Sequence, residues 1–204
     1  MKWRLWVATL LASAFLAAPG RAADPRYPDW PCVQAKVPEV SLAAVWAGPD
    51  LGDAAEKWKD DIAVSALVSR LAARRTPLAE AESAATEFLG GSGEQKLDKG
   101  RRLFAGLFET LNAQRSSVLN GLERITRKQR AAADAVRAAT LSMHALQDAA
   151  TPDPAKIEQL SNQLLWQTRI FEDRQRVIKF VCEVPVAIDQ RLFALGRAIQ
   201  QAME

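Results

Sequence analysis

The chain has 204 residues, of which 49% are hydrophobic, 25% are charged and 7% are aromatic, a composition typical of one globular domain. Its length excludes a large multidomain enzyme, and its two cysteines exclude a disulfide-dense miniprotein because they can form only one bridge. The net charge of +3 comes from Lys2, Arg4 and Arg21, since the remaining 24 basic residues balance 24 acidic ones. We therefore expect no nucleic-acid partner.

Residues 1–22 have the pattern of a cleavable signal peptide. Lys2 and Arg4 precede an apolar run from Leu5 to Ala18, and small residues stand at the minus-three and minus-one positions of a cut after Ala22. The run of 14 residues is shorter than the roughly 20 that a membrane-spanning helix needs, and no later segment is longer. We expect a periplasmic or otherwise secreted protein with no transmembrane segment in the mature chain.

Residues 23–40 are predicted to form an extended, proline-rich strap. Prolines at positions 25, 28, 31 and 38 prevent a regular helix there. Cys32 lies in this strap, and the second cysteine, Cys182, lies near the C-terminus. Because an even pair of cysteines usually closes into a disulfide in an oxidising compartment, we expect a Cys32–Cys182 bridge that pins the strap to a helical body.

Residues 41–90 are predicted to form short helices. Ser41 can cap a first helix, and Asp53 opens a helical segment that continues through Arg75. Thr76 and Pro77 begin another segment, which ends at a pair of glycines at positions 90 and 91.

The rest of the chain is predicted to form one long antiparallel helical hairpin. Apolar residues recur at spacings of three, four and seven through residues 94–150 and again through 155–203, with Pro185 as the expected kink. The fold class is therefore all-α: an elongated helical bundle in which residues 41–204 form a single domain. Residues whose numbers add to about 305 should face each other across the hairpin. This register places Arg130 near Glu172 and Asp173.

Basic residues are concentrated on part of the first arm. The stretch from position 115 to 130 holds five bases and one acid. Four of them form a candidate patch for an anionic partner, either phospholipid headgroups or an acidic protein surface: Arg115, Arg124, Arg127 and Lys128. Solvated charge, or pairing inside the molecule with the acidic segment 39–61 or across the hairpin, is the favoured interpretation.

Few residues indicate catalytic chemistry. His144 is the only histidine, which excludes a multi-histidine zinc site, and no CxxCH motif exists for covalent haem, so no metal or cofactor is expected. Glu80 and Glu87 share a helical face and are the candidate acids for a cell-wall hydrolase. We favour the interpretation that both are ordinary surface glutamates, because the surrounding sequence gives no sign of an aromatic substrate cleft.

Three hypotheses follow for function. The first is a noncatalytic exported protein whose hairpin is a periplasmic protein–protein interaction module or spacer, binding helix against helix through apolar positions outside the internal seam. Self-association through the same face is an open alternative. The second is a small-ligand-binding bundle with a cavity lined by Trp46, Trp58 and Trp166. The third is the hydrolase that uses Glu80 or Glu87.

Overall fold

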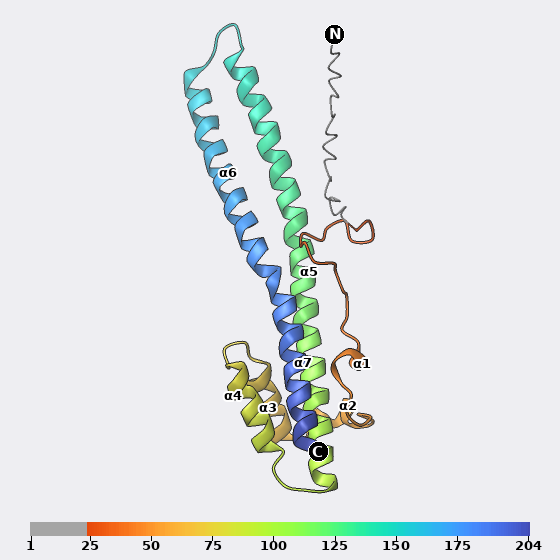
Figure 1. The fold of residues 1–204 in the computed structure, drawn as a ribbon. Helices are drawn as coiled ribbons and strands as arrows, with labels where there is room; N and C mark the ends of the chain where they lie inside the picture. Colours follow the sequence, from red (N-terminus) through yellow and green to blue (C-terminus); the bar gives the residue numbers. More distant parts are fainter. Residues whose placement is uncertain (1–23) are drawn as a thin grey trace, which may run out of the picture.

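The computed structural model describes residues 24–204, so the expected signal peptide at residues 1–22 lies outside the described residues. Every regular element within 24–204 is a helix (Figure 1). Helix α5 (Glu94–Gln147) forms one arm of a long antiparallel hairpin, and α6 (Pro154–Val181) followed by α7 (Glu183–Met203) forms the other. The predicted all-α bundle built on a helical hairpin is confirmed.

Local sequence determines where the second arm begins and bends. The Asp153 side chain caps α6 by accepting hydrogen bonds from the backbone N–H groups of Ala155 and Lys156, and Pro154 occupies the first turn. The break between α6 and α7 lies at Cys182. Pro185 explains it, because it has no N–H to donate to the carbonyl of Val181 and its ring crowds that group.

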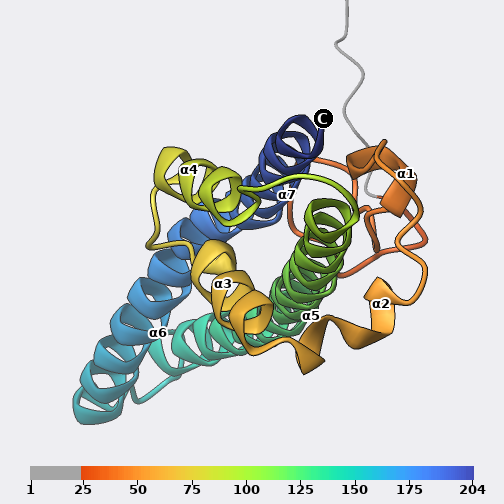
Figure 2. The same ribbon diagram turned by 90° about the horizontal axis from the view of Figure 1, so that it is seen from below.

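The short helices gather at the end of the hairpin that holds the C-terminus. Figure 2 shows α3 and α4 on one side of the α5–α7 pair, with α1 and α2 on the other. The expected continuous segment from Asp53 to Arg75 is wrong, because the Asp61 side chain accepts from the N–H groups of Ala63 and Val64 and starts a new helix. The elements are α1 (Leu42–Val45), α2 (Ala54–Lys57), the 3-10 turn η1 (Trp58–Asp60), α3 (Ile62–Ala72) and α4 (Leu78–Phe88).

The hydrophobic core lies at this same end. Phe104 of α5 is fully buried and stacks on Trp46, with ring centroids 4.1 Å apart. Gly106 lets Trp58 and Val68 pack closely against the backbone of α5, since a Cβ at this position would lie 2.7 Å from atoms of both residues. Other fully buried side chains come from α3, α5 and α7: Leu71, Leu103, Leu107, Leu111, Leu192, Leu195 and Ile199.

The opposite, distal half of the hairpin has little core. Beyond Leu122, only Gln129 and Met143 of α5 are buried, and Ile178 is the only buried residue within α6. The buried Gln129 amide donates to the carbonyl oxygen of Phe171 at 3.0 Å, which fixes the register of the two arms at this level. This half consists of two helices without a third layer, so each helix keeps a face that no described segment covers (Figure 1).

Candidate functional site

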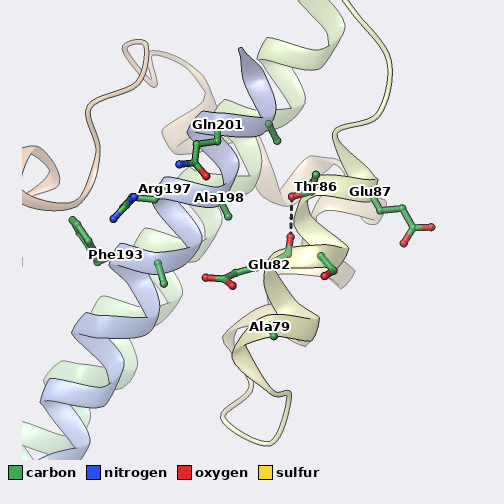
Figure 3. Close-up of a pocket in the computed structure, with 11 residues that line it drawn as sticks. Ala79, Glu82, Thr86, Glu87, Phe193, Arg197, Ala198 and Gln201 are labelled. Atoms are coloured by element: carbon green, nitrogen blue, oxygen red, sulfur yellow. Dashed lines mark hydrogen bonds between the residues drawn. The ribbon is translucent and has the colours of Figure 1, made fainter.

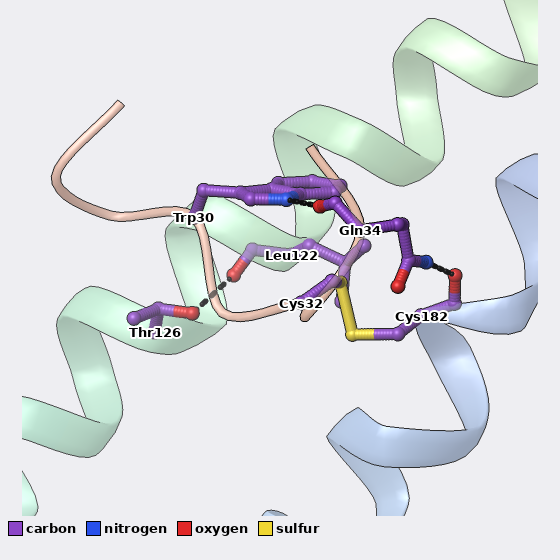
Figure 4. The surroundings of a disulfide bond; sticks show 6 residues. All are labelled: Trp30, Cys32, Gln34, Leu122, Thr126 and Cys182. Atoms are coloured by element: carbon purple, nitrogen blue, oxygen red, sulfur yellow. Dashed lines mark hydrogen bonds between the residues drawn. A yellow bond between two sulfur atoms is a disulfide. The ribbon is translucent and has the colours of Figure 1, made fainter. Parts of the chain in front are cut away.

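The strap is fastened to the middle of the hairpin by the predicted cysteine pair. Cys32 and Cys182 are joined, with their Cα atoms 5.6 Å apart, and Figure 4 shows the bridge beside Trp30 and α5. The Trp30 indole N–H donates to the carbonyl oxygen of Gln34, and the Gln34 amide in turn donates to the Cys182 carbonyl. Trp30 also packs against Leu122, so the strap covers one side of α5 at this level.

The structure divides the predicted anionic-partner patch into two pairs. Arg115 is buried, with its Nε 2.7 Å from Asp189 Oδ1 and its Nη1 donating to the carbonyl oxygen of Val37, so it cannot contact an external partner. The prediction that Arg115 belongs to an exposed patch is wrong. The strap crosses α5 beside Arg115 and buries its side chain, and the sequence pattern does not indicate this crossing. Burial raises the pKa of the Asp189 carboxyl, and the charge of Arg115 acts in the opposite direction.

Arg127 is also occupied within the molecule. Its guanidinium binds Asp29 of the strap at 2.9 Å, and Arg130 binds the same carboxylate at 2.7 Å. Hydrogen bonding from Arg127 and the nearby charge of Arg130 hold the pKa of Asp29 below its usual range. Arg124 and Lys128 are exposed, and neither takes part in an ion pair within residues 24–204.

The predicted tryptophan-lined cavity is wrong. Trp46 and Trp58 are both buried in the core, where their indole N–H groups donate to the carbonyl oxygen of Pro49 and to the Glu109 carboxylate, each at 2.8 Å. Trp166 is exposed on α6, in the distal half of the hairpin. Trp46 and Trp58 pack between the short helices and α5, far along the chain from Trp166 on α6, so the three rings do not line a common cavity.

A shallow groove of about 1000 Å³ lies between α4 and α7 (Figure 3). Glu87 lines this groove, but Glu80 does not and instead binds Arg70 at 2.9 Å. The α7 wall carries Phe193 and Arg197 and no carboxylate. Glycoside hydrolysis usually needs two carboxylates facing each other across the scissile bond, an arrangement that this groove does not provide.

The outer face of α6 carries an exposed apolar stripe. Its members are Trp166, Ile170, Val177 and Phe180, with exposed fractions of 67%, 43%, 58% and 77%. The spacings of four, seven and three residues keep these side chains on one face of the helix over about 21 Å. We call these four residues the outer stripe.

Most of the outer stripe lies away from the face of α6 that packs on α5, and only Val177 also borders the gap between the two helices. The inward face follows a second heptad series, in which Leu164, Phe171 and Ile178 are more buried. The apolar periodicity predicted through residues 155–203 implies one buried seam and does not identify the outer stripe by residue. The sequence of α6 does contain a signal for a second apolar face, because its two offset apolar series hold more large apolar residues than one seam can bury.

Arginine side chains flank the outer stripe on both sides. Arg169 and Arg176 lie along one edge and Arg174 lies along the other, as the helical periodicity of 100° per residue requires. Asp173 sits within the stripe, one heptad after Trp166, and its carboxylate binds Arg176. Local charge therefore favours a partner surface with acidic edges.

Comparisons with known proteins identify no relative: no protein-family model, curated protein or solved structure matches this chain. No helix within residues 24–204 is both long and apolar enough to cross a lipid bilayer. The same part of the chain holds no cluster of three or more metal-binding side chains, and His144 is exposed on α5.

Proposed function

We propose that this protein is a noncatalytic, exported interaction module, in which the outer stripe of α6 binds an amphipathic helix of an envelope or periplasmic partner protein. The observation that carries the proposal is the exposure of Trp166, Ile170, Val177 and Phe180 in heptad spacing on a helix whose other face is already packed. Large aromatic residues in such a row are typical anchors of helix–helix recognition.

The width of the outer stripe favours a helix over a lipid surface. Heptad spacing produces a narrow seam, whereas helices that lie in a membrane interface present a broad apolar face. Asp173 also lies within the stripe, where its ion pair with Arg176 can remain at the edge of a helix–helix contact. Insertion into lipid would bury that carboxylate among acyl chains, at a high desolvation cost.

The flanking charges favour a different protein over a second copy of this chain. A second α6 helix would present its own Arg169 and Arg176 at the contact, so like charges would meet along the edge. A partner helix with glutamates or aspartates beside its apolar face would instead pair with Arg169, Arg174 and Arg176. We therefore propose an acid-flanked amphipathic helix as the partner segment.

The N-terminal sequence and the cysteine pair support export. Lys2 and Arg4, the apolar run up to Ala18 and the small residues before the expected cut have the pattern of a cleavable signal peptide. A disulfide between Cys32 and Cys182 would persist in the oxidising periplasm and would be reduced in most cytosols. In that compartment, the distal half of the hairpin would project the outer stripe away from the core as a spacer.

Site-specific photocrosslinking in the native envelope tests this proposal. A photoreactive phenylalanine analogue is placed at Trp166 or Ile170, and at Gln175 as a control that is exposed on α6 but lies off the outer stripe. The expected result is one discrete adduct from both stripe positions and none from Gln175. The crosslinked peptide should map to an amphipathic helix with acidic edges.

Three results would contradict the proposal: no adduct, an adduct with a second copy of this chain, or equal labelling from Gln175. The variant Ile170→Glu provides a second arm, because a charge in the seam should abolish the adduct formed at Trp166. Thermal unfolding of Ile170→Glu should match that of the natural protein, since Ile170 makes no contribution to the core.

A further inference from the structure

An apolar slot separates α5 and α6 at the level of the disulfide. Its volume is about 420 Å³, within the range of small-ligand sites in proteins. It is open along one side, and apolar groups of both helices form nearly all of its surface. The lining residues from α5 are Val118, Gly121, Leu122 and Ile125, and those from α6 are Asp173, Arg174, Val177, Ile178 and Val181.

Gly121 keeps the slot open. A Cβ built at this position would meet no atom closer than Nη2 of Arg124, at 3.9 Å, so the space above the glycine is not filled by packing. Glycine in the middle of an α-helix is unfavourable relative to alanine, because its unfolded state has more conformational freedom. No close backbone contact at Gly121 explains this cost, in contrast to the crowded Gly106.

The rim of the slot is basic. The Arg124 guanidinium lies next to Gly121, and Lys128 follows one helical turn later on the same side of α5. Arg174 lines the slot from α6. Within residues 24–204 none of these three cations is in an ion pair, whereas the one carboxylate of the lining, Asp173, binds Arg176.

We propose that this α5–α6 slot binds a single-chain anionic amphiphile. The acyl chain would lie against Val118, Gly121, Ile125, Val177 and Val181, and the carboxylate or phosphate head would pair with Arg124 and Arg174. Lys128 would add attraction for the same head group. The inference does not rest on the proposed function, because the ligand would lie in the gap between α5 and α6; Val177 is the one member of the outer stripe that also borders this gap.

The dimensions and charges of the slot argue for this occupant. A protein helix is about 10–12 Å across with its side chains, which is too wide for a space of about 420 Å³ between two adjoining helices. A neutral apolar molecule would leave the guanidinium groups at the rim to water and gain no attraction from them. An acyl chain with an anionic head satisfies both parts of the surface, because apolar groups meet apolar walls and the charged head stays at the open rim.

Titration calorimetry with defined ligands tests the proposal on the purified full-length mature chain. Palmitate and 1-palmitoyl-lysophosphatidylglycerol are the anionic probes, and methyl palmitate and 1-palmitoyl-lysophosphatidylcholine are their matched probes without net charge. All are used below the concentration at which they form micelles. At least one anionic probe should bind one molecule per chain, about tenfold more tightly than its uncharged counterpart. The tighter of the two anionic probes identifies a fatty acid or a phospholipid as the source of the head group.

Chain length and one substitution locate the binding site. Each CH₂ group buried against the slot should strengthen binding about fourfold, so laurate should bind far more weakly than palmitate. Gly121→Leu places a side chain in the slot without a clash and should reduce binding at least tenfold while keeping or raising the melting temperature. Ala135→Leu, which places the same leucine side chain at an exposed position elsewhere on α5, is the control and should bind normally.

A charge variant keeps the proposal falsifiable if Gly121→Leu folds poorly. Arg124→Gln with Arg174→Gln should weaken the anionic probe about tenfold and leave the uncharged probe unchanged, because both side chains lie at the rim. Unchanged palmitate binding by Gly121→Leu, equal binding of charged and uncharged probes, or no binding of either anionic probe would overturn the inference. None of these results depends on a partner helix, so they are distinguishable from failure of the proposed function.

Discussion

Removal of the disulfide should lower the stability of the whole bundle, although the bridge lies outside the main hydrophobic core. The change is the double substitution Cys32→Ser with Cys182→Ser, which leaves no unpaired thiol among the described residues. The bridge joins positions 150 residues apart, so it closes most of the described chain into one loop. In the unfolded state, this restriction removes many conformations that the open chain could otherwise adopt.

The size of the effect follows from the loop length. The chain-entropy model gives about 5 kcal/mol for a loop of this size, and disulfides typically contribute about 2–4 kcal/mol once residual structure of the unfolded chain is included. For a protein of this length, 1 kcal/mol corresponds to about 2–4 °C in melting temperature. We therefore expect the double variant to melt about 4–16 °C below the oxidised protein.

Circular dichroism melts of the oxidised protein, the double variant and the natural protein reduced with dithiothreitol provide the measurement. The variant and the reduced protein should melt at the same temperature. Asp29→Asn is the control, because it removes the exposed ion pairs of the strap with Arg127 and Arg130 but keeps the bridge. If the double variant loses no more stability than Asp29→Asn, the strap is attached without stabilising the bundle and the reasoning is refuted.

Four further substitutions test packing and charge. Gly106→Ala should lower the free energy of unfolding by about 1–3 kcal/mol, because its Cβ would lie 2.7 Å from Trp58. Gly121→Ala should raise it by about 0.5–1 kcal/mol, because its Cβ enters open space. Urea unfolding that ranks the two variants in the opposite order would refute these contacts. Hydrogen bonds from Lys59 and Trp58 hold the pKa of Glu109 low, so Glu109→Gln should destabilise the protein at pH 7 and progressively less as the pH falls below 4; a pH-independent difference would contradict this linkage. Ile170→Glu should change stability by less than about 0.5 kcal/mol, and a large loss of urea resistance would mean that the outer stripe is structural.

The sequence predicts the hairpin and its register well, because both depend on a long periodic pattern. Arg115 lies opposite Asp189 and Gln129 lies opposite Phe171, within about a turn of the expected alignment. The predicted break near Pro185 is confirmed at Cys182, since a proline always lacks the N–H that the helix requires. These features follow from chain chemistry that does not require knowledge of tertiary neighbours.

The sequence predicts individual charge partners poorly. Arg130 does not bind Glu172 or Asp173 but binds Asp29, because the strap crosses α5 at a place that periodicity cannot locate. The burial of Arg115 has the same cause, since its guanidinium donates to carbonyl oxygens of Val37 and Pro38 in the strap. Irregular segments lack a repeating pattern, so their contacts with the helices become visible only in three dimensions.

The periodicity of the sequence predicts one apolar seam through residues 155–203 and does not identify the outer stripe as a second apolar face of α6. Leu164 and Phe171 form the seam with α5, while Trp166 and Ile170 belong to a series on the opposite face. In a bundle of three or more layers both series would be buried, and the sequence pattern would be the same. Only the observation that no described helix covers the distal part of α6 distinguishes the two cases (Figure 1).

Calorimetric titration with designed helical peptides tests the proposed role of the outer stripe most directly. Two peptides share a leucine heptad face, and one has glutamates and the other lysines at the flanking positions. The glutamate peptide should bind the natural protein at least tenfold more tightly than the lysine peptide, and Ile170→Glu should abolish binding while Gln175→Glu, with the same added charge off the stripe, should retain it. Equal affinity for the two peptides, or unchanged binding by Ile170→Glu, would contradict the assignment of α6 as a docking helix.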